Sequence, residues 1–298
     1  MKYRQLGNSD LEISEISFGC MSLEENLNTS QKLIDMAIDC GINYFDTADL
    51  YQQGRNEIML GKAVRNCRDK IIIGTKVGNE LRKDGSGWDW NPSKRYIIKS
   101  VEESLTRLQT DYIDLYQLHG GTIEDPIDET IDAFEILKRE GKIRHYGISS
   151  IRPNVIREYV KRSNIVSVMM QYSILDRRPE EWCLSLLQQN NIGVLARGAL
   201  AKGLLAGKEA KEYMSYSTSE VKNVIEIVNK LSDTNRSMCK TSIQFVLKNP
   251  AITSAVIGIR TEDQLKACAV DSLKEELSNK ELITLRNSNI PNVYNNHR

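Results

Sequence analysis

The 298-residue sequence predicts an α/β fold of the (β/α)8 type, a TIM barrel preceded by an N-terminal β-hairpin. Eight short apolar runs alternate with longer segments of helical periodicity, which indicates parallel strands connected by helices. The length suits one barrel of about 250 residues with additions, so we expect a single domain over residues 1–298. An open doubly wound sheet is the alternative, but no G-x-G-x-x-G motif follows the first predicted strand.

The eight predicted strands are short and rich in β-branched or aromatic residues, as buried parallel strands usually are. They span residues 15–20, 42–46, 70–76, 112–119, 143–149, 165–171, 192–198 and 253–258. Before them, residues 2–6 and 11–14 flank the turn sequence GNSD, which predicts the hairpin.

Three of the intervening segments carry helix boundary signals. In residues 29–40, Thr29 is a candidate N-cap, and a glycine follows the last residue. Residues 91–110 contain Pro92 near their start and apolar residues at three- and four-residue spacing. Residues 128–141 end with basic side chains and a glycine, which suits the negative end of the helix dipole.

Two long connections interrupt this alternation. Residues 78–91 form a polar segment that contains Trp88 and Trp90, and residues 204–219 follow the seventh predicted strand. Long loops on the catalytic face of a barrel often act as lids, although an ordinary surface loop is the alternative. We expect the two tryptophans to contact a substrate.

The composition excludes several functional classes. Forty basic residues balance forty acidic ones, so no basic surface for nucleic acid or for an anionic membrane is expected. No apolar run is long enough to span a membrane, and the N-terminus lacks the apolar core of a signal peptide, so we expect a cytoplasmic protein. The six cysteines form no C-x-x-C pair and are expected to be reduced and mostly buried. With three scattered histidines, we expect no metal site.

Four polar residues stand at or just after the ends of three consecutive predicted strands. Asp46 ends the second strand and Tyr51 follows it, Lys76 ends the third, and His119 ends the fourth. Working residues of a (β/α)8 barrel lie at these strand ends. Each residue alone has an ordinary structural explanation, such as a helix cap, a solvated charge or a core histidine. Together they face the same mouth of the barrel.

These four residue types make a coherent chemical device. A carbonyl that accepts hydride develops negative charge on oxygen and needs a proton there, which a tyrosine hydroxyl can donate. A nearby ammonium stabilises the phenolate that remains, and a carboxylate keeps that ammonium charged and in place. A neutral imidazole can orient the carbonyl oxygen. A nicotinamide cofactor would supply the hydride, while the protein positions and polarises.

The segments that hold these residues resemble the aldo-keto reductase family, in its bacterial NADPH-dependent form. FDTADLYQQGRNEIMLG resembles the segment with the catalytic aspartate and tyrosine, and IIIGTK resembles the strand that ends in the catalytic lysine. SLTRLQTDYIDLYQLH resembles the central signature that ends at the catalytic histidine. The resemblance covers nearly the whole chain. It implies that Tyr51 is the proton donor, that Lys76 and Asp46 tune it, and that His119 orients the substrate.

The resemblance also implies a cofactor site at the later strand ends. Ser149 and Gln171 match residues that contact the nicotinamide carboxamide, although Ser150 stands where the family usually has asparagine. Arg197 occupies the position of an aromatic residue that stacks on the nicotinamide, and backbone amides of residues 200–203 are candidates for binding the diphosphate. The full set of implied cofactor contacts is Gly19, Met21, Asp46, Ser149, Gln171, Arg197, Gly198, Leu200, Lys202, Gly203, Gly258, Arg260 and Gln264.

The segment AVIGIRTEDQL resembles the family's grip on the adenosine 2′-phosphate, with Arg260 and Gln264 at contacting positions. Cys268 replaces a usual asparagine and Ile257 a usual proline, so this part of the site is thinner than in most relatives. The resemblance implies NADPH/NADP⁺ as the cofactor, with NADH as the less favoured alternative.

The expected partner is a small-molecule carbonyl substrate, bound by Met21, Tyr51, Trp88, Trp90 and His119 in an apolar, partly aromatic pocket. Two other functions use the same scaffold. One is a cofactor-binding regulatory subunit, which the complete catalytic set argues against. The other is a net dehydrogenase of sugars or polyols, because hydride transfer is reversible. The sequence contains no indication of the oligomeric state.

Overall fold

The computed structural model describes residues 1–269 and 276–298, and in these ranges eight parallel strands close into a barrel. The closed order is β3–β4–β5–β8–β9–β10–β11–β12, and β12 pairs with β3 through the register Ala255↔Ile16. The strands are β3 (Ile16–Gly19), β4 (Tyr44–Asp46), β5 (Ile72–Val77), β8 (Ile113–Leu118), β9 (Ile143–Ser149), β10 (Ser167–Gln171), β11 (Gly193–Arg197) and β12 (Ile252–Gly258). The predicted (β/α)8 barrel is confirmed, and the open sheet is excluded.

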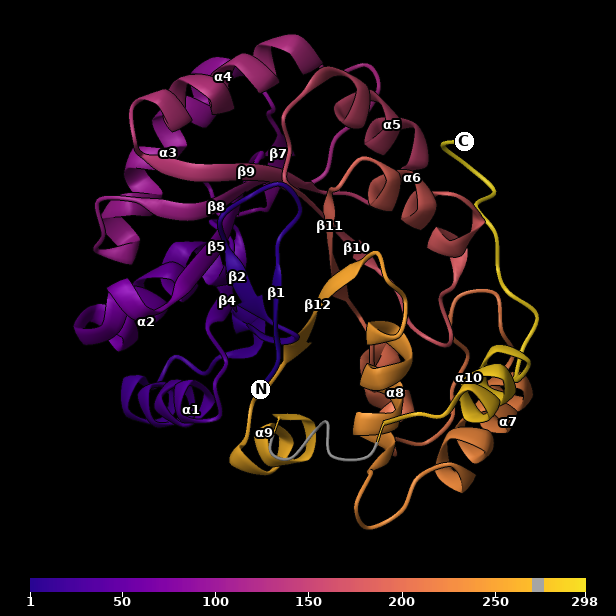
Figure 1. Ribbon diagram of the computed structural model, residues 1–298. Coiled ribbons are helices and arrows are strands. Elements are labelled where there is room, and N and C mark those ends of the chain that lie inside the picture. The colour runs from indigo at the N-terminus through magenta and orange to yellow at the C-terminus, as the bar shows by residue number, and fades with distance from the viewer. Residues whose placement is uncertain (270–275) are drawn as a thin grey trace.

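Helices surround this barrel (Figure 1). They are α1 (Leu27–Asp39), α2 (Arg55–Val64), α3 (Lys94–Leu108), α4 (Ile127–Arg139), α5 (Pro153–Arg162), α6 (Cys183–Gln189), α7 (Thr218–Lys230), α8 (Met238–Leu247), α9 (Glu262–Ala269) and α10 (Asn279–Arg286). The predicted cap of α1 was wrong: the N-cap is Asn26, whose side chain accepts hydrogen bonds from the backbone N–H groups of Asn28 and Thr29. In α3 the cap is Ser93, directly after Pro92. None of the described helices is long and apolar enough to cross a membrane.

The predicted hairpin, β1 (Tyr3–Gln5) paired with β2 (Glu12–Ser14), closes the end of the barrel opposite the catalytic mouth. Its apolar residues Leu6, Leu11 and Ile13 pack into one cluster with inward-facing strand residues such as Leu115 and Met169. In Figure 1 this indigo hairpin lies across the middle of the ring of strands. The core between barrel and helices is a separate and larger cluster.

Two sequence expectations changed. The connection 78–91 contains a second hairpin, β6 (Asn79–Leu81) paired with β7 (Trp88–Trp90), where we had expected a loop. Cys239 of α8 and Cys268 of α9 form a disulfide, so the expectation that all six cysteines are reduced was wrong for this pair. The two residues are 29 positions apart with no motif around them, and only the adjacency of the two helices brings them together. Cys20 and Cys183 are buried free thiols, as expected.

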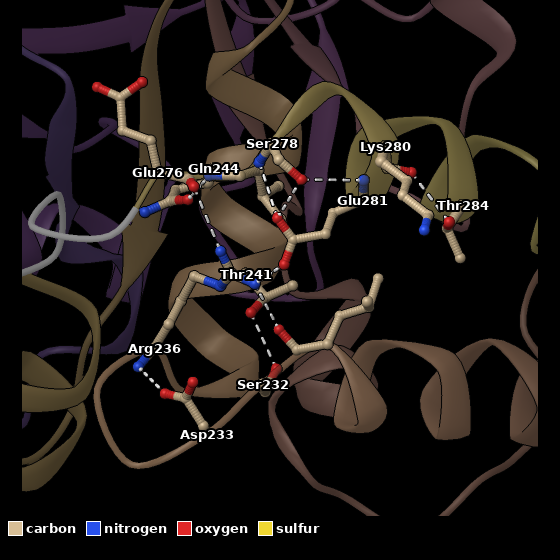
Figure 2. Close-up of polar contacts among 12 residues, drawn as sticks. Ser232, Asp233, Arg236, Thr241, Gln244, Glu276, Ser278, Lys280, Glu281 and Thr284 are labelled. Carbon is tan, nitrogen blue, oxygen red and sulfur yellow. Dashed lines mark hydrogen bonds and ion pairs between the residues drawn. The ribbon is translucent and has the colours of Figure 1, made fainter.

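A polar cluster joins α10 to the end of α7 and the start of α8 (Figure 2). Ser278 caps α10 and exchanges hydrogen bonds with Glu281 in a capping box. The buried Arg236 guanidinium bonds to Glu281 and donates to the Leu231 carbonyl at 2.7 Å. Beside it, the Gln244 side chain accepts a hydrogen bond of 2.8 Å from the Leu277 backbone. The cluster therefore fixes the C-terminal helix to the barrel's outer layer.

We predict that Gly7→Ala destabilises the protein by about 3 kcal/mol or more, through both backbone strain and steric overlap. Gly7 has φ of 55°, and an added Cβ would lie 2.3 Å from the carbonyl oxygen of Val166. Gly85→Ala is the matched control, because Gly85 has φ of 74° but nothing within 4 Å of its added Cβ. The control should lose only about 1 kcal/mol from the left-handed backbone. Urea unfolding measures both, and equal losses would contradict the close packing of the hairpin turn.

Candidate active site

A buried lysine lies at the centre of the barrel mouth. The Lys76 ammonium donates to Asp46 Oδ2 at 2.6 Å, to the Thr47 carbonyl at 2.6 Å and to the Tyr51 hydroxyl at 3.4 Å. Strand register places the two charged residues on neighbouring strands, because Asp46 pairs with Gly74 of β5, two positions before Lys76. Each of the three N–H bonds of the ammonium thus has an oxygen acceptor, and all three acceptors come from the end of β4 and the loop that follows it.

The electrostatics of this pair favour a charged lysine. Burial alone lowers the pKa of Lys76, but the attraction of Asp46 and of Tyr51 outweighs it, so the pKa lies above its usual value. Burial raises the pKa of Asp46, and the Lys76 ammonium opposes this effect. A buried charge without a partner would cost several kcal/mol. Lys76 and Asp46 can therefore both be charged in the barrel interior only because they form an ion pair.

The turn that carries Tyr51 has unusual backbone geometry. Gln52 and Gln53 have φ values of 50° and 55°, a left-handed conformation that is unfavourable for residues other than glycine. Asn56 compensates from the start of α2: it accepts a 2.7 Å hydrogen bond from Thr47 and donates one of 3.0 Å to the Gln52 side chain. The turn is therefore held in a single shape, and the Tyr51 hydroxyl stays beside Lys76.

Behind the lysine lies a buried acidic network that the sequence analysis missed. Glu57 accepts hydrogen bonds from Thr75 and from Arg107, both at 2.6 Å. Burial, together with the negative charge of Glu57, raises the pKa of Asp49 to about 8. The signal was present in the sequence, because two further carboxyl groups stand close to Asp46 and Tyr51. Their burial, however, could not be read from the sequence.

His119 directly follows the end of β8, and its ring faces that of Tyr51. Its ring meets that of Tyr51 edge to face, with ring centroids 5.9 Å apart. Burial lowers the pKa of His119 to about 3, and the positive charges of Lys76 and Arg197 act in the same direction. The imidazole is therefore neutral at ordinary pH. Its buried Nδ1 has no hydrogen-bond partner in the described part of the chain.

Three residues expected to contact the cofactor end adjacent strands: Ser149 on β9, Gln171 on β10 and Arg197 on β11. Arg197 Nη1 donates to Gln171 Oε1 at 3.2 Å, and within residues 1–269 and 276–298 it makes no ion pair with a carboxylate. Gln171 Nε2 in turn donates to the Tyr213 hydroxyl at 3.0 Å. Tyr213 belongs to the long connection after β11, and the sequence analysis did not identify it.

The other expected contacts lie around this group. Residues 200–203 form a tight turn with Lys202 at φ 60°, in which the backbone N–H of Gly203 donates to Leu200 at 2.8 Å. At least one of the four amides proposed for the diphosphate is therefore already engaged. Of the remaining expected cofactor contacts, Gly19 is buried. The others are exposed: Met21, Gly198, Gly258, Arg260 and Gln264.

Arg260 is exposed, two residues after the end of β12. Its guanidinium has no hydrogen bond or ion pair within the described residues, while its backbone N–H donates to Gln264 Oε1 at 2.9 Å. Gln264 is thus turned back onto the start of α9. An exposed arginine without an acidic partner has its full donor capacity available for an anion.

The two tryptophans of the second hairpin occupy different environments. Trp90 packs against Gly78 and Gly120, next to His119, and donates to Asp125 at 2.9 Å. Trp88 is 48% exposed at the hairpin edge. Trp90 therefore borders the site as a fixed wall, whereas Trp88 has a free surface.

Comparison with known proteins gives a consistent result. The profile of the Aldo/keto reductase family matches residues 15–290. The chain is 51% identical over 307 residues to the uncharacterized oxidoreductase YqkF of Bacillus subtilis, covering all of both chains. It is 28% identical to the NADH-specific methylglyoxal reductase of Escherichia coli, covering 96% of this chain and 98% of that one.

A solved structure is similar over the whole chain. The holo form of aldo-keto reductase AKR11C1 from Bacillus halodurans superposes with a TM-score of 0.94 at 50% identity, covering 100% of this chain and 99% of that one. The apo form of the same protein gives a TM-score of 0.86. With the barrel, the buried lysine pair and the family profile in agreement, the chain belongs to the aldo/keto reductase family of oxidoreductases, which act on carbonyl groups with a nicotinamide cofactor.

Proposed function

We propose that this chain, acting as one domain over residues 1–298, is an NADPH-dependent reductase of aldehydes or ketones with Tyr51 as the proton donor. The observation that carries the proposal is the Lys76 ammonium, which bonds both to Asp46 at 2.6 Å and to the Tyr51 hydroxyl at 3.4 Å. The tyrosine hydroxyl can give its proton to a carbonyl oxygen while the ammonium stabilises the charge left on the phenol. The neutral His119 is suited to orient the same oxygen.

The donor set at the strand ends fits a nicotinamide ring. A hydroxyl from Ser149 and an amide from Gln171 suit its carboxamide, and the planar Arg197 guanidinium can lie against its face. When bound, the reduced cofactor supplies the hydride. The residues of the chain bind and orient it, and they deliver the proton at Tyr51 Oη. The likeness to the holo form of AKR11C1 supports a site shaped for a cofactor.

The choice of NADPH rests on Arg260. Its exposed guanidinium has no acidic partner in the described residues, and it can bind a 2′-phosphate through two charge-assisted hydrogen bonds. NADH remains the alternative, and one relative is named as NADH-specific.

One assay separates a reductase from a regulatory subunit that only binds the cofactor. NADPH oxidation is followed at about 340 nm with a reactive aldehyde such as 4-nitrobenzaldehyde. Steady turnover supports the reductase, whereas tight NADPH binding without turnover supports the regulatory subunit. Oxidation of a sugar or polyol with NADP⁺, at a rate exceeding the reductions, would support a net dehydrogenase.

Tyr51→Phe should reduce carbonyl turnover by about 10²–10⁴-fold, the usual contribution of general acid catalysis. NADPH affinity, followed by quenching of tryptophan fluorescence, should hardly change because the ring remains in place. The assay needs a substrate whose chemical step limits the rate. A variant that keeps more than half of the wild-type turnover would show that another group donates the proton.

Arg260→Ala should weaken NADPH binding by about 1.5–3 kcal/mol, since hydrogen bonds to a charged phosphate are lost. Binding of NADH, which has no 2′-phosphate, should remain nearly constant. Arg139→Ala is a control at an exposed arginine of α4. Dissociation constants for both cofactors decide the matter, and equal losses for the two would remove Arg260 from the phosphate site.

Arg197→Tyr should improve NADP⁺ binding more than NADPH binding, because oxidised nicotinamide is positive and the arginine repels it. At 4 Å and an effective dielectric of 20 the repulsion is about 4 kcal/mol, and solvent with the diphosphate reduces it to about 1 kcal/mol. The Arg197 charge already acts inside the site, since it helps to lower the pKa of His119. The expected change in the ratio of the two dissociation constants is about five-fold. Arg197→Lys keeps the charge and should keep the ratio, and an unchanged ratio in the tyrosine variant would contradict the repulsion.

A further inference from the structure

The Arg197 guanidinium is directed by a neutral partner. Strand register sets Gln171 of β10 beside Arg197 of β11, and Arg197 Nη1 donates to Gln171 Oε1 at 3.2 Å. The guanidinium pairs with no carboxylate in the part of the chain that the structure describes. A carboxylate would neutralise the arginine, whereas an amide oxygen accepts its hydrogen bond and leaves the positive charge in place. Gln171 therefore gives the guanidinium a direction without cancelling its charge.

The long connection after β11 holds the other end of the same amide. Gln171 Nε2 donates to the Tyr213 hydroxyl at 3.0 Å and to the Met214 sulfur at 3.7 Å. A guanidinium can only donate hydrogen bonds, whereas a hydroxyl and a thioether sulfur can accept them, so the amide fits in one orientation. The reverse orientation would set its NH₂ group against the arginine. Tyr213 thus fixes Gln171, and Gln171 fixes Arg197.

Tyr213 belongs to a closed and anchored turn. Its backbone N–H donates to the Tyr216 carbonyl at 3.1 Å, and the Tyr216 N–H donates to the Tyr213 carbonyl at 3.0 Å. The Tyr216 hydroxyl donates to the Ile290 carbonyl at 2.7 Å and accepts from the Asn292 backbone N–H at 3.1 Å. Both tyrosine side chains pack into the main core. The C-terminal segment therefore holds one tyrosine of the turn, while the other reaches the strand ends.

The chain of bonds from Tyr213 to Gln171 carries no charge of its own. Burial raises the pKa of Tyr213 to about 12, with the negative charge of Asp176 acting in the same direction, so the hydroxyl stays neutral at ordinary pH. The hydrogen-bond partners of Arg197 therefore leave its charge free to act on its surroundings. That charge already reaches His119, whose pKa it helps to lower.

We propose that Tyr213 is a positioning residue of the reductase site: its hydroxyl, acting through the Gln171 amide, holds the Arg197 guanidinium at the nicotinamide position and so sets how strongly the oxidised ring is repelled. This inference rests on the function proposed above, in which Arg197 lies against the nicotinamide. A long arginine side chain without this hold would turn toward water or the diphosphate when a positive ring binds. Held in place, it cannot avoid that charge.

The test is Tyr213→Phe, which removes the hydroxyl and keeps the ring. Dissociation constants of NADP⁺ and NADPH are measured by titration calorimetry, and their ratio is compared with that of wild type. NADP⁺ binding should gain about two- to three-fold over NADPH binding, part of the roughly five-fold change expected for Arg197→Tyr. Gln171→Met keeps the volume and breaks the same chain at its middle, so it should shift the ratio in the same direction and serves if Tyr213→Phe does not fold.

Tyr216→Phe is the matched control. Tyr213 and Tyr216 are both 7% exposed and lie in the same turn, but the Tyr216 hydroxyl bonds to the C-terminal segment instead of Gln171. Both variants lose a hydroxyl that forms hydrogen bonds, so their urea midpoints should fall by similar amounts. Tyr216→Phe should nevertheless keep the wild-type ratio of the two dissociation constants.

A double-mutant cycle with Arg197→Ala separates positioning from a general loosening of the turn. In the Arg197→Ala background, Tyr213→Phe should no longer change the ratio, because the charge that it positions is absent. A loosened turn would alter cofactor binding whether or not the arginine is present.

An unchanged ratio in Tyr213→Phe would overturn the proposal, as would an equal shift in Tyr216→Phe or a shift that persists in the Arg197→Ala background. A shift in Arg197→Tyr without one in Tyr213→Phe would remove the positioning role alone. Because binding needs no turnover, these results are distinct from a failure of the proposed function, which would appear as a wild-type protein that reduces no carbonyl. If wild type binds NADH more tightly than NADPH, the ratio is measured with NAD⁺ and NADH, which carry the same ring.

Discussion

A lysine ammonium with no exposure to water is the constraint on which the arrangement of the barrel mouth depends. Such a charge is stable only with an opposite charge in contact and acceptors for its remaining protons. Asp46, the Thr47 carbonyl and the Tyr51 hydroxyl meet that requirement for Lys76. The requirement explains why the end of β4, the following turn and β5 must stay in fixed positions relative to one another. A shift of any one of them would leave a buried charge unpaired.

The surrounding structure serves to keep that relation. The turn after Tyr51 stores backbone strain at Gln52 and Gln53, which persists only because hydrogen bonds from Asn56 and the strand ends hold it. Position 74 of β5 is a glycine, because the Tyr44 hydroxyl occupies the space that a side chain there would need. At the far end, the N-terminal hairpin fills the barrel with apolar side chains. Water is thereby excluded from below, which strengthens the electrostatic interactions above.

Most of the fold followed from local patterns. Each predicted strand overlaps an observed one, and the hairpin formed where GNSD indicated a turn. Strand-end position was sufficient to select Asp46, Lys76 and His119, because parallel strands in a barrel all end at the same mouth. The errors came where side chains compete locally. Asn26 took the cap expected of Thr29, and residues 79–90 paired as strands within a segment too polar to show alternation.

The sequence by itself determined the fold class, the order of the strands and the identity of Lys76 and the three residues around it, because these depend on periodicity and on motifs within short stretches. Tertiary structure alone decided which distant side chains meet. The disulfide between Cys239 and Cys268 and the hydrogen bond from Gln171 to Tyr213 join residues far apart in the chain. Burial is likewise a property of the closed barrel. The neutrality of His119 and the raised pKa of Asp49 therefore appear only once the strands have assembled around them.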